Sequence, residues 1–498
     1  MTRHGHYPMG GENPPRSVAY EQGKFGRLFP TLPPIGLDTP TLRAALMELG
    51  QPGGRMDAGD DLSDPVALLS DPARSVNNPN NPDLSAGMTF LGQFLDHDLT
   101  FDPTSSLERQ VDPEAISNFR TPALELDSVY GSGPGATPHL YDQQPADPFD
   151  RGIKLLTEAI DGCEAVSRGG VTRHDLPRNR QGVALTGDPR NDENLIVSQL
   201  HLALLRFHNA AVDHVRAELG AAARPAEVFM EAQRLVRWHY QWMIVHEFLP
   251  KTCGPGVVQD VLESGRKFYK WRNAPYIPVE FSVAAYRFGH SQVRPSYRAN
   301  FGADDAGQFV GLILNASLPP SPDPDDLRGE HRAPRRFVDW QTFFDFGDGR
   351  VKPNKKIDTR LSSVLFALPG FGAGDVASLA QRNLLRQLTF SVPSGQRVAR
   401  AMKLDELLAA DLDDLKDLHL EARTPLWYYI LREADVQQGG KRLGAVGARI
   451  VTEVFVGVLE GDHTSYLALD PEWTPIFGQN GDFGITDLLS FAGVVVEF

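Results

Sequence analysis

The chain has 498 residues, of which 41% are hydrophobic and 23% charged, so it can bury a large core and is not intrinsically disordered. Its formal net charge of −15, with no run of Lys and Arg that would form a basic stripe, excludes a nucleic-acid-binding protein of the usual kind. The two cysteines, Cys163 and Cys253, allow at most one internal disulfide and exclude a Cys-based zinc site.

The N-terminal region is rich in Pro and Gly, and residues 1–40 predict an extended arm that precedes one large domain over residues 41–498. Residues 1–30 contain no apolar segment typical of a secretory signal peptide, which leaves a cytoplasmic location and export by an unconventional route both open. The longest apolar stretch, residues 443–459, contains Arg449 and Glu453 and predicts a buried helix rather than a membrane span.

Helices are expected where apolar residues recur every three or four positions. They cover residues 89–100, 195–219, 226–249 (ended by Pro250), 279–293 (with Pro278 in the first turn), 375–388 (capped by Asp375), 405–418 and 443–460. Residues 52–86, with an Asn- and Pro-rich stretch at 77–82, and residues 103–150 and 316–335 predict loops. Alternating strands are scarce, so the expected fold class is mainly α: a single helical body with long loops and few short strands.

The first helix carries four polar side chains in an apolar setting: Gln93, Asp96, His97 and Asp98. Gln93 and His97 share a helix face, and the two carboxylates project to either side of His97. A helix with a core histidine and two solvated carboxylates could have the same pattern. However, residues 92–98 (Gly-Gln-Phe-Leu-Asp-His-Asp) resemble the distal motif of animal-type haem peroxidases, of the peroxidase–cyclooxygenase superfamily and its bacterial-type branch, and further motifs follow in the same order.

Residues 118–131 resemble the calcium loop of that family, although a surface turn is the simpler alternative. Alternating oxygen donors suit a hard cation, which binds six to eight oxygens. The resemblance implies calcium ligands at Asp98, Thr121, Ala123, Glu125 and Asp127. Relatives usually have Asp where this chain has Glu125, so direct coordination by the longer side chain is an open point.

Residues 187–194 resemble the segment that carries the catalytic distal arginine, here Arg190. A guanidinium beside bound peroxide would stabilise the negative charge that develops on the departing oxygen. Glu193 and Asp96 match the two carboxylates that become esterified to haem methyl groups. Mammalian members have a methionine after that glutamate, but this chain has Asn194, which excludes a sulfonium link and argues against chloride oxidation. Without the other motifs, Arg190 and Glu193 would be read as a salt bridge in a first helical turn.

Residues 285–290 resemble the proximal motif, in which His290 would ligate the haem iron. Arg287 matches the arginine that pairs with a haem propionate. A ligating histidine usually donates its second ring N–H to an acceptor. The matching acceptor is Asn383, and Arg386, three residues further along the same helix, could reach a propionate. A helix-surface amide is the alternative for Asn383.

The resemblance implies a haem b enzyme that reduces hydrogen peroxide, with His97 and Arg190 as catalytic groups and Gln93 near the bound ligand. It implies a ferryl radical intermediate and oxidation of bromide, iodide, thiocyanate or small organic donors. The oligomeric state stays open, with a monomer among the possibilities.

Two alternatives remain. The first is a fatty-acid dioxygenase of the same superfamily, whose radical-forming tyrosine lies three residues before the proximal histidine. Arg287 occupies that place here, and Tyr286 is one position further away. The second is a non-catalytic adhesion or matrix module on the same fold, against which the joint presence of the motifs argues. Four other histidines lack a supporting third ligand and are interpreted as core or helix-face residues: His201, His208, His239 and His246.

Overall fold

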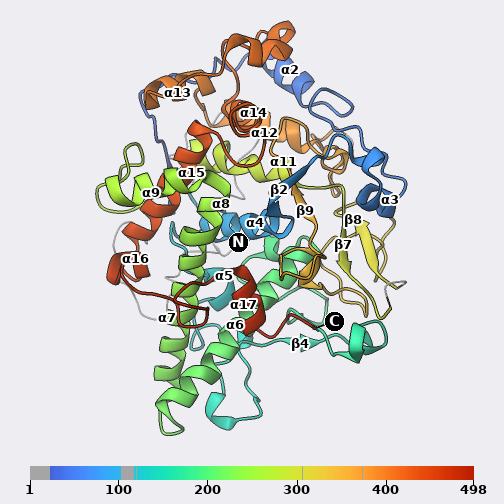
Figure 1. The fold of residues 1–498 in the computed structure, drawn as a ribbon, viewed down its shortest axis with the longest axis vertical. Helices are drawn as coiled ribbons and strands as arrows, with labels where there is room; N and C mark the ends of the chain where they lie inside the picture. Colours follow the sequence, from blue (N-terminus) through green and yellow to red (C-terminus); the bar gives the residue numbers. More distant parts are fainter. Residues whose placement is uncertain (1–22, 102–116, 119, 305–306, 373, 498) are drawn as a thin grey trace.

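The computed structural model describes residues 23–101, 117–118, 120–304, 307–372 and 374–497. Helices dominate this part of the chain, as expected, and the fold is a single helical body (Figure 1). The α-helices are α2 (Pro40–Leu49), α3 (Pro65–Ser70), α4 (Gly87–Leu99), α5 (Asp127–Tyr130), α6 (Leu195–Leu219), α7 (Pro225–Met243), α8 (Leu249–Cys253), α9 (Pro255–Ser264), α10 (Val279–Ser282), α11 (Gly289–Gln292), α12 (Leu379–Thr389), α13 (Gly395–Met402), α14 (Leu426–Gln438), α15 (Ala445–Gly461), α16 (Tyr466–Leu469) and α17 (Ile485–Phe491).

The strands are few and short. They are β1 (Gly23–Gly26), β2 (Asn80–Ser85), β3 (Ser117–Asn118), β4 (Glu158–Ala159), β5 (His174–Asp175), β6 (Ile277–Pro278), β7 (Ser296–Asn300), β8 (Phe309–Leu312) and β9 (Pro353–Lys355). They form one three-stranded sheet in the order β3-β1-β6 and three two-stranded pairs, β2-β9, β4-β5 and β7-β8. These sheets therefore tie distant loops together without forming a barrel.

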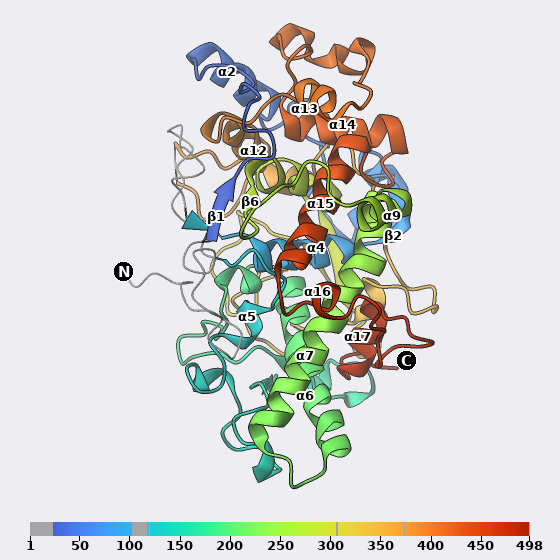
Figure 2. The ribbon, with the colours of Figure 1, turned by 90° about the vertical axis from the view of Figure 1, so that its left-hand side faces the viewer.

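Helix α4 lies at the centre of the molecule, between the long α6–α7 pair and the group of α12, α14 and α15 (Figures 1 and 2). It packs against α6 and against the short helix α11. Phe90, Phe94 and Leu95 are almost fully buried, and each contributes about 1.5–3 kcal/mol to folding by the usual scale of apolar burial. The same helix thus anchors the core and carries the predicted distal residues.

Helix α6 follows its expected bounds because both ends are well defined. The side chain of Asn194 accepts a hydrogen bond from the Val197 amide at 3.0 Å and caps the N-terminus. Gly220, with a φ of 83°, ends the helix and allows the reversal into α7. This fixed start places residues 190–194 beside α4.

Three helix predictions were wrong in detail. The helix through residues 226–249 does not stop at Pro250, because a π-helical turn, η8 (Ile244–Phe248), leads without interruption into α8, where the proline occupies the first turn. The helix near 379 is capped by Ser378, whereas Asp375 accepts a bond from the Gly372 amide. The helix near 405–418 is a kinked 3₁₀ helix, η12 (Ala409–Leu418).

The expected helix over 279–293 is also wrong, because it is broken into α10, the 3₁₀ helix η9 (Ala285–Phe288) and α11. Pro278 is the residue before α10 rather than a member of its first turn. Side chains bind carbonyls at the break: Arg287 donates to Ser282 and Gln387 donates to Val283. These bonds replace helical amide bonds and turn the His290 segment away from the axis of α10.

Within the expected loop 52–86, two segments were predicted wrongly: residues 65–70 form α3, and residues 80–85 form β2, which pairs with β9. Part of the expected arm lies on the body: β1 joins the sheet, and Glu280 accepts hydrogen bonds from the amides of Leu28 and Phe29 at 3.0 and 3.1 Å. Residues 1–22 of the arm and 102–116 of the second loop lie outside the described residues.

Both cysteines are buried and free, so the one disulfide that the sequence allowed does not form between them. Within the described ranges, no helix combines the length and the apolar character needed to cross a membrane.

Candidate active site

The distal helix α4 presents its four polar residues to different neighbours. His97 is buried, and its Nδ1 lies 2.8 Å from Oδ1 of Asn191. Asp98 is buried on the side of the 120–128 segment, where its Oδ2 accepts bonds from the Leu126 amide and the Tyr240 hydroxyl. Asp96 accepts a bond from the Thr100 hydroxyl at 3.1 Å. The helix therefore presents its polar groups to separate surroundings, with Asp96 at a cavity and Asp98 beside the 120–128 segment.

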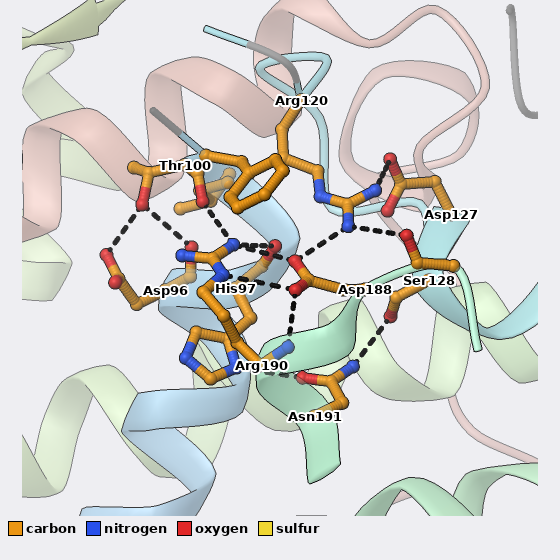
Figure 3. A network of polar contacts seen from close by, with 12 residues as sticks. Asp96, His97, Thr100, Arg120, Asp127, Ser128, Asp188, Arg190 and Asn191 are labelled. Carbon is orange, nitrogen blue, oxygen red and sulfur yellow. Dashed lines mark hydrogen bonds and ion pairs between the residues drawn. The ribbon is translucent and has the colours of Figure 1, made fainter. Parts of the chain in front are cut away.

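Arg190 lies in a short 3₁₀ helix, η7 (Pro189–Asp192), which begins after the cap residue Asp188. The Asp188 carboxylate accepts from Nε of Arg190 at 3.1 Å and from its Nη2 at 2.7 Å. Nη2 also donates to the carbonyls of His97 and Thr100 (Figure 3). These contacts bind one edge of the guanidinium and hold Arg190 against α4.

A buried ion network continues from this arginine. Arg120 pairs with Asp188 at 2.6 Å and with Asp127 at 2.8 Å, and all three side chains are at most 3% exposed (Figure 3). The pKa of Asp188 is held far below its usual range: burial alone would raise it, but Arg190 and Arg120 outweigh that effect. Gly187 permits this approach, because a Cβ there would come within 2.8 Å of the Ser128 backbone.

Glu193 lies between the predicted catalytic groups. Its carboxylate accepts a bond from the Gln93 amide, and its Oε1 is 3.9 Å from Nε2 of His97. The side chain is 47% exposed, although desolvation by the surrounding protein still raises its pKa to about 7. Asn194 donates to Gln93 at 3.3 Å and completes this group.

His290 lies on α11, which packs against α4. Its Nδ1 is 2.7 Å from the side-chain amide of Asn383 on α12, whose oxygen accepts a bond from Arg287 at 3.3 Å. The Tyr286 hydroxyl donates to the carbonyl of Gly92 on α4 at 3.1 Å. Desolvation lowers the pKa of His290 to about 3, and the same effect brings that of His97 to about 3. Both imidazoles are therefore neutral at ordinary pH.

A cavity of about 190 Å³ lies beside these residues. Its lining consists of Phe25, Asp96, Thr100, Phe101, Arg190, Ser282, Val283, Arg287, Arg386 and Phe390. Four predicted site residues therefore meet here (Asp96, Arg190, Arg287 and Arg386), whereas His97 and His290 are not among the lining residues. Three guanidinium groups against one carboxylate give the cavity a positive character suited to a ligand with carboxylate groups.

The predicted haem contacts fit these observations. Two neutral imidazoles stand on adjoining elements, and Asn383 contacts Nδ1 of His290, so Nε2 is the nitrogen that would bind a metal once the amide oxygen faces the ring. Arg287 and Arg386 lie at the same cavity, where propionates would require positive charge. The residues present can therefore hold a haem.

The second predicted site is a buried carboxylate cluster beside α4. Asp98, Glu125 and Asp127 are at most 7% exposed, and among the described atoms Oδ1 of both aspartates has no hydrogen-bond partner. Burial raises the pKa of all three carboxyls, in the case of Glu125 to about 7. Thr121 donates to Glu125. Unpaired buried carboxylate oxygens are costly, and a bound cation would relieve that cost.

Two observations decide which groups could bind a cation at this carboxylate cluster. Arg120 already pairs with Asp127. In the part of the chain that the structure describes, no three His, Cys, Asp or Glu side chains are arranged to hold a metal ion by themselves. A cation here would therefore need oxygens of Thr121 and Ala123 in addition to the carboxylates.

Sequence reasoning missed the residues behind the catalytic pair: Asp188, Asn191, Arg120 and Ser128. An Asp-Pro pair before Arg190 is a recognisable helix-start signal and could have identified Asp188 as the cap. Nothing local indicates that Arg120 or Ser128 meets them, because those contacts span more than 60 residues.

The sequence of this chain is similar to a known family model and to several known proteins. Residues 108–309 match the family model for animal haem peroxidases. Chorion peroxidase of Drosophila melanogaster is 25% identical over 358 residues, covering 69% of this chain and 41% of that protein. Thyroid peroxidase of Mus musculus is 27% identical over 191 residues, covering 37% of this chain and 20% of that protein. The chain thus spans less than half the length of these relatives.

Solved structures show the same fold. Peroxidase A from Dictyostelium discoideum superposes with a TM-score of 0.64 at 17% identity, covering 99% of this chain and 98% of that one. A fatty acid alpha-dioxygenase of Arabidopsis thaliana gives 0.57 at 14% identity, covering 95% of this chain and 76% of that one. At these identities the likeness concerns the fold alone.

Proposed function

The chain belongs to the animal haem peroxidase family, and from this premise we propose that it is an enzyme that reduces hydrogen peroxide at a haem b between His97 and His290. The observation that carries the proposal is the pair of neutral imidazoles, buried at His97 and partly buried at His290, on the adjoining helices α4 and α11, each with Nδ1 against a side-chain amide. The His290 imidazole can then bind the metal, while the His97 imidazole accepts and donates a proton.

In this proposal, Nε2 of His97 accepts a proton from peroxide and returns it to the departing oxygen. Its depressed pKa keeps the ring in the neutral form that a base requires. Arg190, fixed along one edge by Asp188, stabilises the charge that develops as the oxygen–oxygen bond breaks. Gln93, bound to Glu193, directs an amide toward the same space.

His290, Asn383, Arg287 and Arg386 would hold the haem, and Asp96 and Glu193 would form ester links with it. The bound haem would supply the two-electron reduction of peroxide and store the oxidising equivalents. An iron-bound His290 needs a proton on Nδ1, so the oxygen of Asn383 would have to face the ring. Arg287, which now donates to that oxygen, would then be released toward a propionate.

We also propose that calcium binds at Asp98, Thr121, Ala123, Glu125 and Asp127. The support is the pair of unpaired carboxylate oxygens in the buried cluster. The proposed electron donors are bromide, iodide, thiocyanate and small organic molecules. Chloride is not among the proposed donors, because Asn194 cannot form the sulfonium link that the family resemblance associates with chloride oxidation.

The dioxygenase alternative has weaker support at the residue level. Arg287 occupies the position of the radical-forming tyrosine, and the hydroxyl of Tyr286 is engaged by the Gly92 carbonyl. A peroxidase therefore accounts better for the residues around His290.

One experiment tests the proposal directly: absorption spectra of the haem-loaded protein before and after stoichiometric peroxide, then after bromide, iodide or phenol. We expect a Soret band that shifts with peroxide and returns with a donor. Absence of a Soret band after haem supplementation would favour the non-catalytic module. Consumption of oxygen with a fatty acid and no peroxide would favour the dioxygenase.

A further inference from the structure

Asn191 is the residue that contacts the back of the distal imidazole. Its side chain is fully buried in η7, next to Arg190. Its Oδ1 lies 2.8 Å from Nδ1 of His97 (Figure 3). An amide oxygen can only accept, so this contact requires a proton on Nδ1 of His97.

The other end of the same amide is occupied as well. Nδ2 of Asn191 donates to the Ser128 hydroxyl at 3.1 Å and lies 3.0 Å from Nδ1 of His201. Both of these partners are buried, Ser128 from α5 and His201 from α6. With Nδ2 donating to the Ser128 hydroxyl and to an unprotonated Nδ1 of His201, the amide oxygen faces His97.

With Nδ1 protonated, the lone pair of a neutral imidazole is on Nε2. Nε2 lies 3.9 Å from Oε1 of Glu193, which is beyond hydrogen-bond range. A base that must accept a proton from a small ligand needs this orientation and this tautomer. Without an acceptor at Nδ1, the ring could carry its proton on either nitrogen and rotate about its bond to Cβ.

We propose that Asn191 is the positioning residue for His97: its amide oxygen selects the Nδ1–H tautomer and holds Nε2 toward the substrate. This role rests on the proposed peroxidase function and deepens it. The residue acts through His97 and does not itself touch peroxide. Because the amide is neutral, it orients the ring without placing a negative charge beside Arg190.

Two substitutions separate orientation from mere packing. Asn191→Ala removes the acceptor, whereas Asn191→Asp keeps an acceptor oxygen at the same place. The matched control is Asn209→Ala on α6, which removes a partly buried amide bonded to the backbone of Leu155, outside the site.

The first readout does not depend on turnover. In the ferric cyanide complex of the haem-loaded, ¹⁵N-histidine-labelled protein, NMR should show a slowly exchanging Nδ1–H proton of His97. We expect this signal in the wild type, in Asn191→Asp and in Asn209→Ala, and its loss in Asn191→Ala. Because HCN delivers its own proton to Nε2 when it binds, the test is the Nδ1 position: a wild-type spectrum with no proton on Nδ1 of His97 would overturn the proposal.

The second readout is the stopped-flow rate of reaction with peroxide at unchanged haem content. General acid–base catalysis contributes about 10²–10⁴-fold, so partial loss of alignment should slow Asn191→Ala by about 10- to 100-fold. Asn191→Asp should recover most of that rate. An unchanged rate in Asn191→Ala, or equal slowing in Ala and Asp, would overturn the positioning role.

These experiments distinguish failure of the proposed function from failure of the role proposed for Asn191. If the wild type binds haem but does not react with peroxide, the proposed function fails. If it reacts and the variants do not behave as stated, only the role of Asn191 fails. Should Asn191→Ala not fold, the NMR signal of Asn191→Asp decides alone: retention supports the proposal and loss contradicts it.

Discussion

His97 and His290 have similar surroundings at one ring nitrogen, and the proposed function gives them different roles. Both have Nδ1 against a buried side-chain amide, Asn191 for His97 and Asn383 for His290. Desolvation lowers the pKa of each to about 3, so neither is protonated near neutrality. The two contacts differ in the end of the amide that faces the ring: the oxygen of Asn191 faces His97, whereas the nitrogen of Asn383 faces His290 and its oxygen accepts from Arg287. On the Nε2 side of His97 lies Glu193, which is bound by Gln93.

His290→Ala should abolish stable haem binding, because the proposed iron ligand is removed and nothing else on α11 can replace it. The measurement is the ratio of Soret to protein absorbance after haem loading and gel filtration. His246→Ala is the control, since His246 is exposed and stacks on Trp242 at 3.7 Å, away from the site. Normal haem content and spectrum in His290→Ala would show that the proximal assignment is wrong.

Arg190→Ala should slow the reaction with peroxide by about 10²-fold or more, as the removal of a preorganised electrostatic stabiliser commonly does. Stopped-flow rates at equal haem content provide the measurement. Arg234→Ala is the matched control, because that guanidinium pairs with Glu231 on the surface of α7. A rate equal to that of the wild type would exclude the catalytic role.

At the scale of elements, the 120–128 segment supports α4 and η7 together. It contributes Asp127 and Glu125 to the carboxylate cluster with Asp98, and it sends Arg120 to Asp188. Leu126 adopts a left-handed conformation with φ of 58°, which costs about 1–3 kcal/mol for a non-glycine residue. A bound cation is one way in which the fold could compensate such strain.

Calcium affinity should therefore depend on pH. In the metal-free protein the pKa of Glu125 is raised to about 7, so below pH 7 a proton occupies this carboxyl and competes with the cation. We expect the dissociation constant to rise about tenfold per pH unit below 7. Titration calorimetry at pH 5.5 and 7.5 measures this change. Glu125→Gln should bind more weakly at pH 7.5 and lose much of the pH dependence; a wild-type affinity independent of pH would contradict a role for Glu125.

At the scale of the whole molecule, the sequence predicted features that depend on apolar periodicity or on motifs that resemble a known family. The mainly helical class and the bounds of α6 followed from apolar periodicity and a good cap, and the family motifs indicated Arg190 and His290. It could not predict breaks that depend on distant partners. The helix around Val283 is interrupted because Gln387, more than 100 residues later, takes its carbonyl. The proposed role of Asn191 could not be predicted for the same reason, because it depends on a contact with His97, 94 residues earlier in the chain.

The N-terminal arm joins distant parts of the whole molecule, because it binds α10, which precedes the helix that carries His290. Glu280 on α10 accepts the amides of Leu28 and Phe29 and is fully buried. Glu280→Ala should leave those amides unpaired, at a cost of about 1–3 kcal/mol for each buried donor. Limited proteolysis should then cleave within residues 23–39 faster than in the wild type. Equal cleavage rates would show that the arm is held by other contacts.

Asp127, Arg120, Asp188 and Arg190 form a row of alternating charges, each in contact with the next. Moving any one of them changes the electrostatic balance felt by the others, since little water reaches the row to screen it. A substitution in the 120–128 segment, remote from any substrate, could therefore tune how strongly Arg190 acts on peroxide. Relatives that differ in this segment would be expected to differ in reactivity even where the pocket itself is identical.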